Sequence, residues 1–361
     1  MVPNAVERHL YEPDYAVAPG EILLETIEAL GMTQKELGVR TGLSPKTINL
    51  IIQRQEPITY ETAIRLERAT GTAAALWNNL EKNYRQQLAR LADHRKLGAE
   101  ADWLDSIPVE ELANRHVVAV TEDTTALLEA VLGFFGVNSV QAWKDLWLDP
   151  HVAARRSQCF QSQPGATATW LRLGELHALN AECKPYDRTK FRDALAHIRG
   201  LTKETTEAFV PQMKQRCAET GVALVFEQEI KGAPWYGASW WLTSEKAVIE
   251  LGLRYKWEDQ FWFSFFHEAG HILNDSKKGV FINTGKDGDP GEDKANQFAA
   301  DFLIPPDKAG RVPFLKSYSQ VGALADELGI SPSIVIGRFQ RETGKWSYFN
   351  KLRRKLAWAD E

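Results

Sequence analysis

Two histidines and a glutamate lie close together in the stretch His-Glu-Ala-Gly-His at 267–271. In an α-helix, His267 and His271 project from one face on adjacent turns, so both imidazoles can bind one metal ion. The spacing fits the HExxH pattern of zinc hydrolases, in which the glutamate takes a proton from water on the metal. Mostly apolar residues on both sides predict that this helix is buried. The sequence therefore predicts a Zn²⁺ site with His267 and His271 as ligands and Glu268 as the catalytic base.

A catalytic zinc site of this kind needs a third protein ligand, with the fourth position left for water. Downstream, residues 290–305 have apolar positions at spacings of three and four between flanking prolines, which predicts an amphipathic helix. Glu292 lies in the first turn of that helix, where a carboxylate also suits the helix dipole. Asp293 and Asp301 are rival ligands, and helix geometry alone leaves the choice among the three acids open.

The sequence around these residues resembles the ImmA/IrrE family of zinc metallopeptidases. The HEAGH motif is followed by the pattern Glu-x-x-Ala-Asn-x-Phe-Ala-Ala-x-x-Leu-x-Pro, which begins at Glu292. Two upstream segments, 237–242 and 249–254, also resemble the strands that precede the zinc helix in that family. The resemblance covers roughly residues 160 to 340. It implies that Glu292 is the third metal ligand.

The N-terminal segment has a different pattern. Residues 21–30 read as an amphipathic helix, and Thr33 and Glu36 then form a capping box at the start of a second helix. Ser44 and Pro45 are the N-cap and first residue of a third helix, which runs to residue 54. Two short helices around a glycine-containing turn make the helix-turn-helix plan, whose second helix lies in the DNA major groove.

Polar side chains of this hairpin are candidate DNA contacts. Lys46, Thr47 and Asn49 lie early in the predicted recognition helix, so they can face base edges. Lysine can donate to guanine, asparagine can bind adenine through two bonds, and the threonine methyl can touch thymine. Because one recognition helix reads only a half-site, we expect a homodimer on an inverted repeat. The side chains better placed to contact phosphates are Gln34, Arg40 and Arg54.

Residues 17–90 resemble the HigA-type antitoxin branch of the XRE repressors. The segments that carry this similarity are 19–23, 31–34, 41–44, 62–67 and 76–80. The resemblance implies double-stranded operator DNA as one partner, and it raises the prospect of a toxin as another. One departure lies after the recognition helix, where such repressors commonly have Asn-Gly-Lys and this chain has Gln53-Arg54-Gln55. The turn therefore lacks its glycine.

The length of 361 residues predicts two or three domains. We expect a helix-turn-helix domain over 1–90, a helical connector over 91–160 and the metallopeptidase domain over 161–361. The net charge of −5 argues against nonspecific coating of DNA. No apolar run approaches the ~18 residues of a membrane span, and the first residues begin no signal peptide, so a cytoplasmic protein is expected. Neither a disulfide framework nor a cysteine-rich zinc site is indicated by the widely spaced Cys159, Cys183 and Cys217.

The predicted fold class is α+β and mostly α-helical. An all-α N-terminal domain precedes a zincin-like domain that has a small antiparallel sheet and the HExxH helix. Helices are expected at 166–183, 187–199 and 202–219, and strands at 222–226, 236–242 and 247–251. A substrate peptide is expected to add to a sheet edge beside one of the last two strands. Trp143 and Trp147, and a second helix-turn-helix pattern over 321–338, are interpreted as core packing.

Two functions fit this sequence. The first is an antitoxin-like transcriptional regulator whose zinc endopeptidase domain cleaves a regulatory protein. The alternative is an autorepressing antitoxin whose zinc domain senses a signal or binds a partner without significant proteolysis. The intact His-Glu-His-Glu set favours the first function on chemical grounds, and fusion to a DNA-binding module favours regulation in both.

Overall fold

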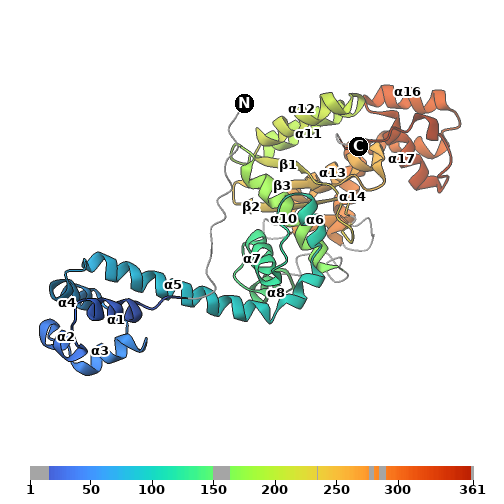
Figure 1. Cartoon of the computed structure of the whole chain (residues 1–361). Helices are drawn as coiled ribbons and strands as arrows, with labels where there is room; N and C mark the ends of the chain where they lie inside the picture. Colours follow the sequence, from blue (N-terminus) through green and yellow to red (C-terminus); the bar gives the residue numbers. More distant parts are fainter. Residues whose placement is uncertain (1–15, 149–162, 234, 276–279, 284–289, 359–361) are drawn as a thin grey trace, which may run out of the picture. The chain divides into compact units, whose positions relative to one another are not determined.

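The computed structural model describes residues 16–148, 163–233, 235–275, 280–283 and 290–358, and Figure 1 shows how their helices and strands follow one another. The chain divides into two compact units. Unit 1 comprises residues up to Ala101 together with Asp123–Ala126, and unit 2 comprises Asp102–Glu122 and the chain from Leu127 onward. Most of the described residues are helical, as predicted.

Unit 1 is all α-helical. Its helices are α1 (Pro19–Ala29), α2 (Gln34–Thr41), α3 (Pro45–Ile52), α4 (Tyr60–Thr70) and α5 (Ala74–Gly98). Their apolar faces enclose a core that includes Leu23, Leu37, Ile48, Leu66 and Trp77, all fully buried. This confirms the helical N-terminal module.

The sheet of unit 2 is preceded by helices, and the three predicted over 166–219 are present. After the short 3-10 helix η1 (Ala101–Ser106), the elements are α6 (Val109–Asn114), α7 (Thr124–Phe135), α8 (Val140–Leu148), α10 (Pro164–Asn180), α11 (Arg188–Gly200) and α12 (Thr206–Ala218). Trp143 and Trp147 are buried, as core packing requires. Cys183 and Cys217 are free thiols, whereas Cys159 lies outside the described residues.

One stretch, Thr124–Leu148, is long and apolar enough to be a candidate membrane span, with a mean hydropathy of 1.2. This differs from the expectation that no apolar run approaches the ~18 residues of a membrane span. The stretch is two helices rather than one, because α7 ends at Phe135 and α8 begins at Val140, with Gly136 in the left-handed conformation between them. Each is shorter than the about 20 residues that a span needs. The rings of Phe135 and Trp143 instead pack edge to face at 5.7 Å.

A four-stranded sheet of unit 2 has the order β1-β3-β2-β4. The strands are β1 (Val222–Phe226), β2 (Gly237–Thr243), β3 (Lys246–Leu251) and β4 (Val280–Asn283). β2 is antiparallel to both β3 and β4, but β1 is parallel to β3. The sheet is therefore mixed: the predicted antiparallel pairing is confirmed for β2 and β3 and wrong for β1, because the β2–β3 hairpin leaves β1 to pair with the outer edge of β3. β4 is an additional strand.

This strand order also corrects the expected substrate edge. β3 has a neighbour on both sides, and β2 pairs with β3 and, over residues 237–240 beside the metal helix, with β4. Among the described strands, β1 and β4 form the edges of the sheet. A peptide that adds a strand can therefore pair with β1 or β4, but not with β3 or with residues 237–240 of β2.

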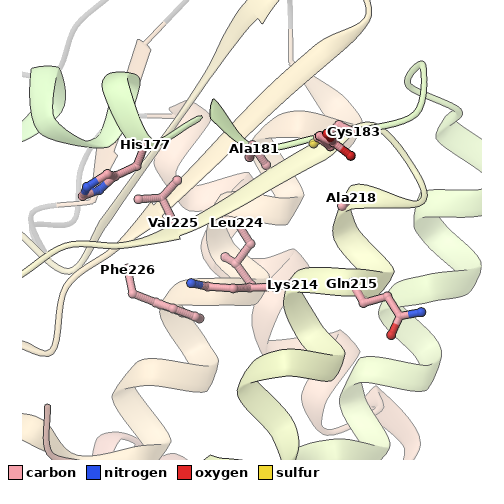
Figure 2. A pocket seen from close by; sticks show the side chains of 11 residues that line it. His177, Ala181, Cys183, Lys214, Gln215, Ala218, Leu224, Val225 and Phe226 are labelled. Atoms are coloured by element: carbon pink, nitrogen blue, oxygen red, sulfur yellow. The ribbon is translucent and has the colours of Figure 1, made fainter. Parts of the chain in front are cut away.

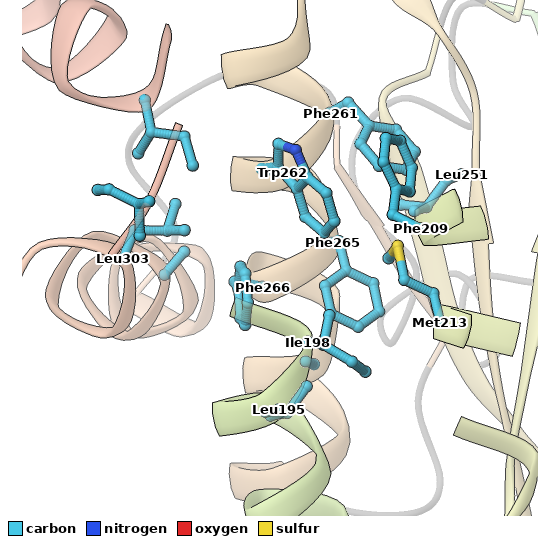
Figure 3. Packing of buried hydrophobic residues seen from close by; sticks show 14 of the residues in the cluster. Leu195, Ile198, Phe209, Met213, Leu251, Phe261, Trp262, Phe265, Phe266 and Leu303 are labelled. Carbon is cyan, nitrogen blue, oxygen red and sulfur yellow. The ribbon is translucent and has the colours of Figure 1, made fainter. Parts of the chain in front are cut away.

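Helix α13 (Glu258–Asn274) carries the HExxH motif and is buried on most sides, as predicted. The ring of Trp262 lies 4.8 Å from that of Phe209 on α12, and Phe266 stacks at 5.0 Å on Phe302 of α14 (Pro290–Leu303). Figure 3 shows Phe261, Trp262, Phe265 and Phe266 projecting from α13 in several directions into this packing. Because side chains fix the helix from several sides, the motif residues are held rigidly.

The last described helices are α15 (Pro306–Ala309), α16 (Tyr318–Leu328) and α17 (Pro332–Thr343). They are accompanied by the short 3-10 helices η5 (Val312–Phe314) and η6 (Asn350–Leu352). Leu324 of α16 and Phe339 of α17 are buried in the same core as α13. The second helix-turn-helix pattern is thus a packing element, as interpreted from the sequence.

A buried acid lies on the sheet face that α10 covers. Glu250 of β3 is fully buried, and a Cβ atom on Gly174 of α10 would come within 2.3 Å of its carboxyl group. Glycine at this position therefore makes room for the acid. Burial, together with the nearby charge of Glu227, raises the pKa of Glu250 well above its ordinary value, which favours the neutral form of this carboxyl group.

Candidate metal centre and DNA-binding hairpin

Three side chains from α13 and α14 converge on one point. The Nε2 atoms of His267 and His271 are 3.1 Å apart. The Glu292 carboxylate oxygens lie 3.1 Å from Nε2 of His267 and 3.3 Å from Nε2 of His271. Donors bound at 2.0–2.1 Å to a tetrahedral Zn²⁺ ion stand about 3.3 Å apart. The spacing between the two imidazole nitrogens, and between each nitrogen and a Glu292 oxygen, therefore fits zinc.

The close approach of α13 and α14 explains why Glu292 is the acid that joins the histidines. A Cβ atom on Gly270 would lie 3.0 Å from the Phe298 ring, so the small residue lets the two helices pack tightly. Among the described residues, His267, His271 and Glu292 form a cluster of metal-ligating type, and neither Asp293 nor Asp301 belongs to it. Asp293 is exposed instead.

Two further residues, which the sequence patterns did not indicate, orient the imidazoles. Nδ1 of His267 donates to Asn296 Oδ1 at 3.0 Å, and Nδ1 of His271 donates to Asp275 Oδ2 at 2.7 Å. Such partners fix the ring orientation, so that Nε2 is the nitrogen that can bind a metal once it carries no proton. Asp275 follows His271 by four residues, so helical spacing could have revealed it.

Hydrogen bonds within the cluster shift the pKa values of Glu292 and His271 in opposite directions. Burial by itself would raise the pKa of Glu292, but hydrogen bonds to His267 and His271 lower it to about 2. Burial by itself would lower the pKa of His271, but hydrogen bonds to Asp275 and Glu292 raise it to about 10. Glu292 is thus ionised near pH 7, and a metal ion would displace a proton from His271.

Glu268 lies beside the cluster without joining it. Its side chain is fully buried, and Oε2 accepts a hydrogen bond of 2.6 Å from Ser239 Oγ on β2, whereas Oε1 has no hydrogen-bond partner among the described residues. Burial raises the pKa of Glu268, and the nearby histidines and Ser239 offset part of this. A carboxylate with a raised pKa is a better proton acceptor.

β4 is the sheet edge next to this cluster. The ring of Phe281, in the middle of β4, stacks on the His271 ring at 4.3 Å and 8°. Phe281 also pairs in register with Ser239, whose hydroxyl binds Glu268. Both the candidate ligands and the candidate base therefore adjoin the same edge.

In unit 1, the helix-turn-helix hairpin has the predicted caps. Thr33 Oγ1 accepts from the backbone N–H of Glu36, and Ser44 Oγ accepts from that of Thr47. The capping box is only half formed, because Arg40 binds the Glu36 carboxylate at 2.6 Å. Lys46 and Asn49 are exposed on α3, whereas the Thr47 hydroxyl contacts Ser44 Oγ at 2.9 Å.

Two of the three residues predicted to contact phosphates form ion pairs within unit 1. Arg40 is paired with Glu36, Arg54 is paired with Glu21, and Gln34 is half-buried. Arg54 has φ +66°, the left-handed conformation that glycine adopts without strain. The chain thus keeps the shape of a glycine turn while placing an arginine there.

Residues 23–77 match the helix-turn-helix family, and residues 225–340 match the IrrE N-terminal-like domain. The chain belongs to the XRE-type helix-turn-helix proteins and carries an IrrE/ImmA-like domain. A curated relative, virulence-associated protein I of Dichelobacter nodosus, is 37% identical over 75 residues, which is 20% of this chain and 69% of that protein.

The two matched regions contain every candidate site residue. The XRE-type match spans the whole hairpin, and the IrrE/ImmA-like match spans His267, Glu268, His271 and Glu292 with their partners Asp275 and Asn296. Helices α10–α12 lie outside both matches.

Proposed function

We propose that this protein is an antitoxin-like transcriptional regulator of the HigA type whose IrrE/ImmA-like domain is a zinc-dependent endopeptidase. It acts in the cytoplasm, binds an inverted repeat as a homodimer and cleaves a regulatory protein. The proposed enzymatic activity rests on one observation: His267, His271 and Glu292 converge beside the carboxylate of Glu268, which is not part of the ligand cluster.

The residues present fit a catalytic zinc ion. Two imidazoles and one carboxylate leave a fourth position open, which is the ligand set of a catalytic rather than a structural site. When bound, Zn²⁺ supplies a Lewis acid that polarises a carbonyl group and lowers the pKa of water. Glu268 then accepts the proton of the attacking water and passes it to the leaving amine, while Ser239 holds its carboxylate in place.

An extended substrate is proposed to lie along β4. This strand is a sheet edge, and Phe281 places it against His271. Backbone pairing with Val280–Asn283 would carry a peptide past the metal ligands.

A second candidate function is supported by the burial of the site. His267, Glu268 and His271 are all at most 1% exposed, so a peptide carbonyl reaches them only after the site opens. In that case the domain senses a signal or binds a toxin or another partner, and the protein is an autorepressor with little proteolysis.

Removal of the metal separates these two functions. The wild-type chain is incubated with proteins encoded by neighbouring reading frames, first as purified, then after chelation, and then after addition of one equivalent of Zn²⁺. The endopeptidase function predicts a discrete cut that disappears on chelation and returns with zinc. A partner that binds tightly but stays intact under all three conditions supports the autorepressor instead.

For the DNA-binding half, Thr47→Ala with Asn49→Ala should reduce the preference for the operator over random DNA. We expect a loss of about tenfold for each base contact removed, as a bidentate contact is worth about 1–3 kcal/mol. The salt dependence of binding should change little, because phosphate contacts set it. Electrophoretic mobility shifts at several salt concentrations measure both. The control is Asn79→Ala, which changes an exposed asparagine on α5. If the wild type, the double variant and this control all prefer the operator equally, another surface reads the bases.

A further inference from the structure

A groove of about 540 Å³ runs along the free edge of β1, at the opposite side of the sheet from β4. One wall is formed by His177 of α10 and by Ala181 and Cys183 of the segment that follows α10. Helix α12 contributes Lys214, Gln215 and Ala218. Figure 2 shows Leu224, Val225 and Phe226 of β1 between these groups. Its volume is within the range of ligand pockets.

The backbone of β1 offers unpaired groups to this groove. In the parallel ladder with β3, Ala247 donates to the Gly221 carbonyl and Glu227 donates to the Leu251 carbonyl. Odd-numbered residues of β1 therefore bond to β3, and the N–H and C=O groups of Leu224 and Phe226 point to the open edge. An added strand would satisfy these groups.

The walls that α10 and α12 contribute to the groove select what can bind. A second sheet edge, including β1 of another copy of this chain, brings its own covering helices, and these would collide with α10 and α12. A single extended peptide has no such layers and fits between the walls. Small side chains along the groove, including Ala181 and Ala218, leave room for its apolar residues.

The charges of the groove favour an acidic peptide. The Lys214 ammonium lies 5.1 Å from the centre of the Phe226 ring and has no ion pair with a described residue. His177 is held by Glu227 at 3.1 Å. Glu182, beside Cys183, is the acid of the lining and is exposed, whereas Lys214 lies over Phe226 of β1 itself. An acidic side chain placed next to Lys214 would thus fix the register of the added strand.

We propose that this β1 groove is a second peptide-binding site, which takes an extended, acidic segment of a partner protein by β-strand addition. It is separate from the metal centre, because three strand spacings, about 14 Å, separate β1 from β4. A partner can therefore be held here whether or not the metal centre acts on it.

Short fluorescein-labelled peptides of alternating valine and threonine test this site. One carries a central glutamate, one a central lysine and one a central proline, which cannot donate a backbone hydrogen bond. Fluorescence anisotropy with the full chain should show saturable binding of the glutamate peptide, at least about tenfold weaker binding of the lysine peptide and none of the proline peptide. Lys214→Glu should reverse the charge preference, and Ala218→Trp should abolish binding by filling the groove. Lys190→Glu on α11 is the matched control and should change nothing.

Hydrogen exchange locates the bound peptide. With the glutamate peptide, the amides of Leu224 and Phe226 should gain protection, whereas those of Val280–Asn283 should not. The proposal is overturned if none of the peptides binds, if Lys214→Glu leaves the charge preference as it was, or if the protection appears on β4.

Discussion

Glu268→Gln is expected to retain bound zinc and operator binding while slowing peptide cleavage on the order of a hundredfold to ten-thousandfold, the usual contribution of a general base. The amide is nearly isosteric with the carboxylate and can still contact Ser239, so the fold around it should persist. What it lacks is the ability to accept a proton from the attacking water. Single-turnover cleavage of the physiological partner measures the rate, and the zinc content of the same sample shows whether the metal is retained.

Glu245→Gln is a matched control for this variant, because it makes the same change in an exposed turn between β2 and β3. It should cleave at the wild-type rate. Cleavage by Glu268→Gln at that rate would show that another group accepts the proton.

His271→Ala is expected to weaken zinc binding by more than about a hundredfold. Loss of a partner that merely orients a ligand costs 10- to 100-fold in metal affinity, and this change removes a ligand itself. It also leaves Asp275 and Glu292 without the imidazole that joins them. Competition with a fluorescent zinc chelator measures the affinity, and thermal unfolding with and without zinc shows whether the variant still folds.

His197→Ala removes an exposed histidine of α11 and should keep the wild-type affinity for zinc. If His271→Ala also holds stoichiometric zinc at that affinity, the metal lies elsewhere in the chain.

Local patterns predicted most of the elements that hold these residues. The i, i+4 histidines and their apolar flanks predicted α13, and Ser44 with Pro45 predicted the start of α3, because each signal lies within one or two helical turns. The six DNA-contact candidates lie on or next to the expected hairpin for the same reason. Whether they contact bases and phosphates stays a prediction.

Local sequence patterns did not predict the features that depend on contacts between distant segments. β4 has four residues, too few for an alternating pattern, and the parallel pairing of β1 with β3 depends on which edge of a hairpin is free. Helix spacing left the choice between Glu292 and Asp293 open, and only the family resemblance implied Glu292; the packing of Gly270 against Phe298 brings α14 close to the histidines. Arg54 in a left-handed turn shows that a missing glycine need not change the backbone.

X-ray absorption at the zinc edge, on the full chain loaded with one equivalent of Zn²⁺, tests the metal centre most directly. His267, His271 and Glu292 predict a shell of nitrogen and oxygen donors at about 2.0–2.1 Å with the outer scattering of imidazole rings. That imidazole signal should fall in His271→Ala. A sulfur shell at about 2.3 Å, which would assign the ion to a cysteine, or a spectrum that His271→Ala leaves unchanged, would contradict the proposed centre.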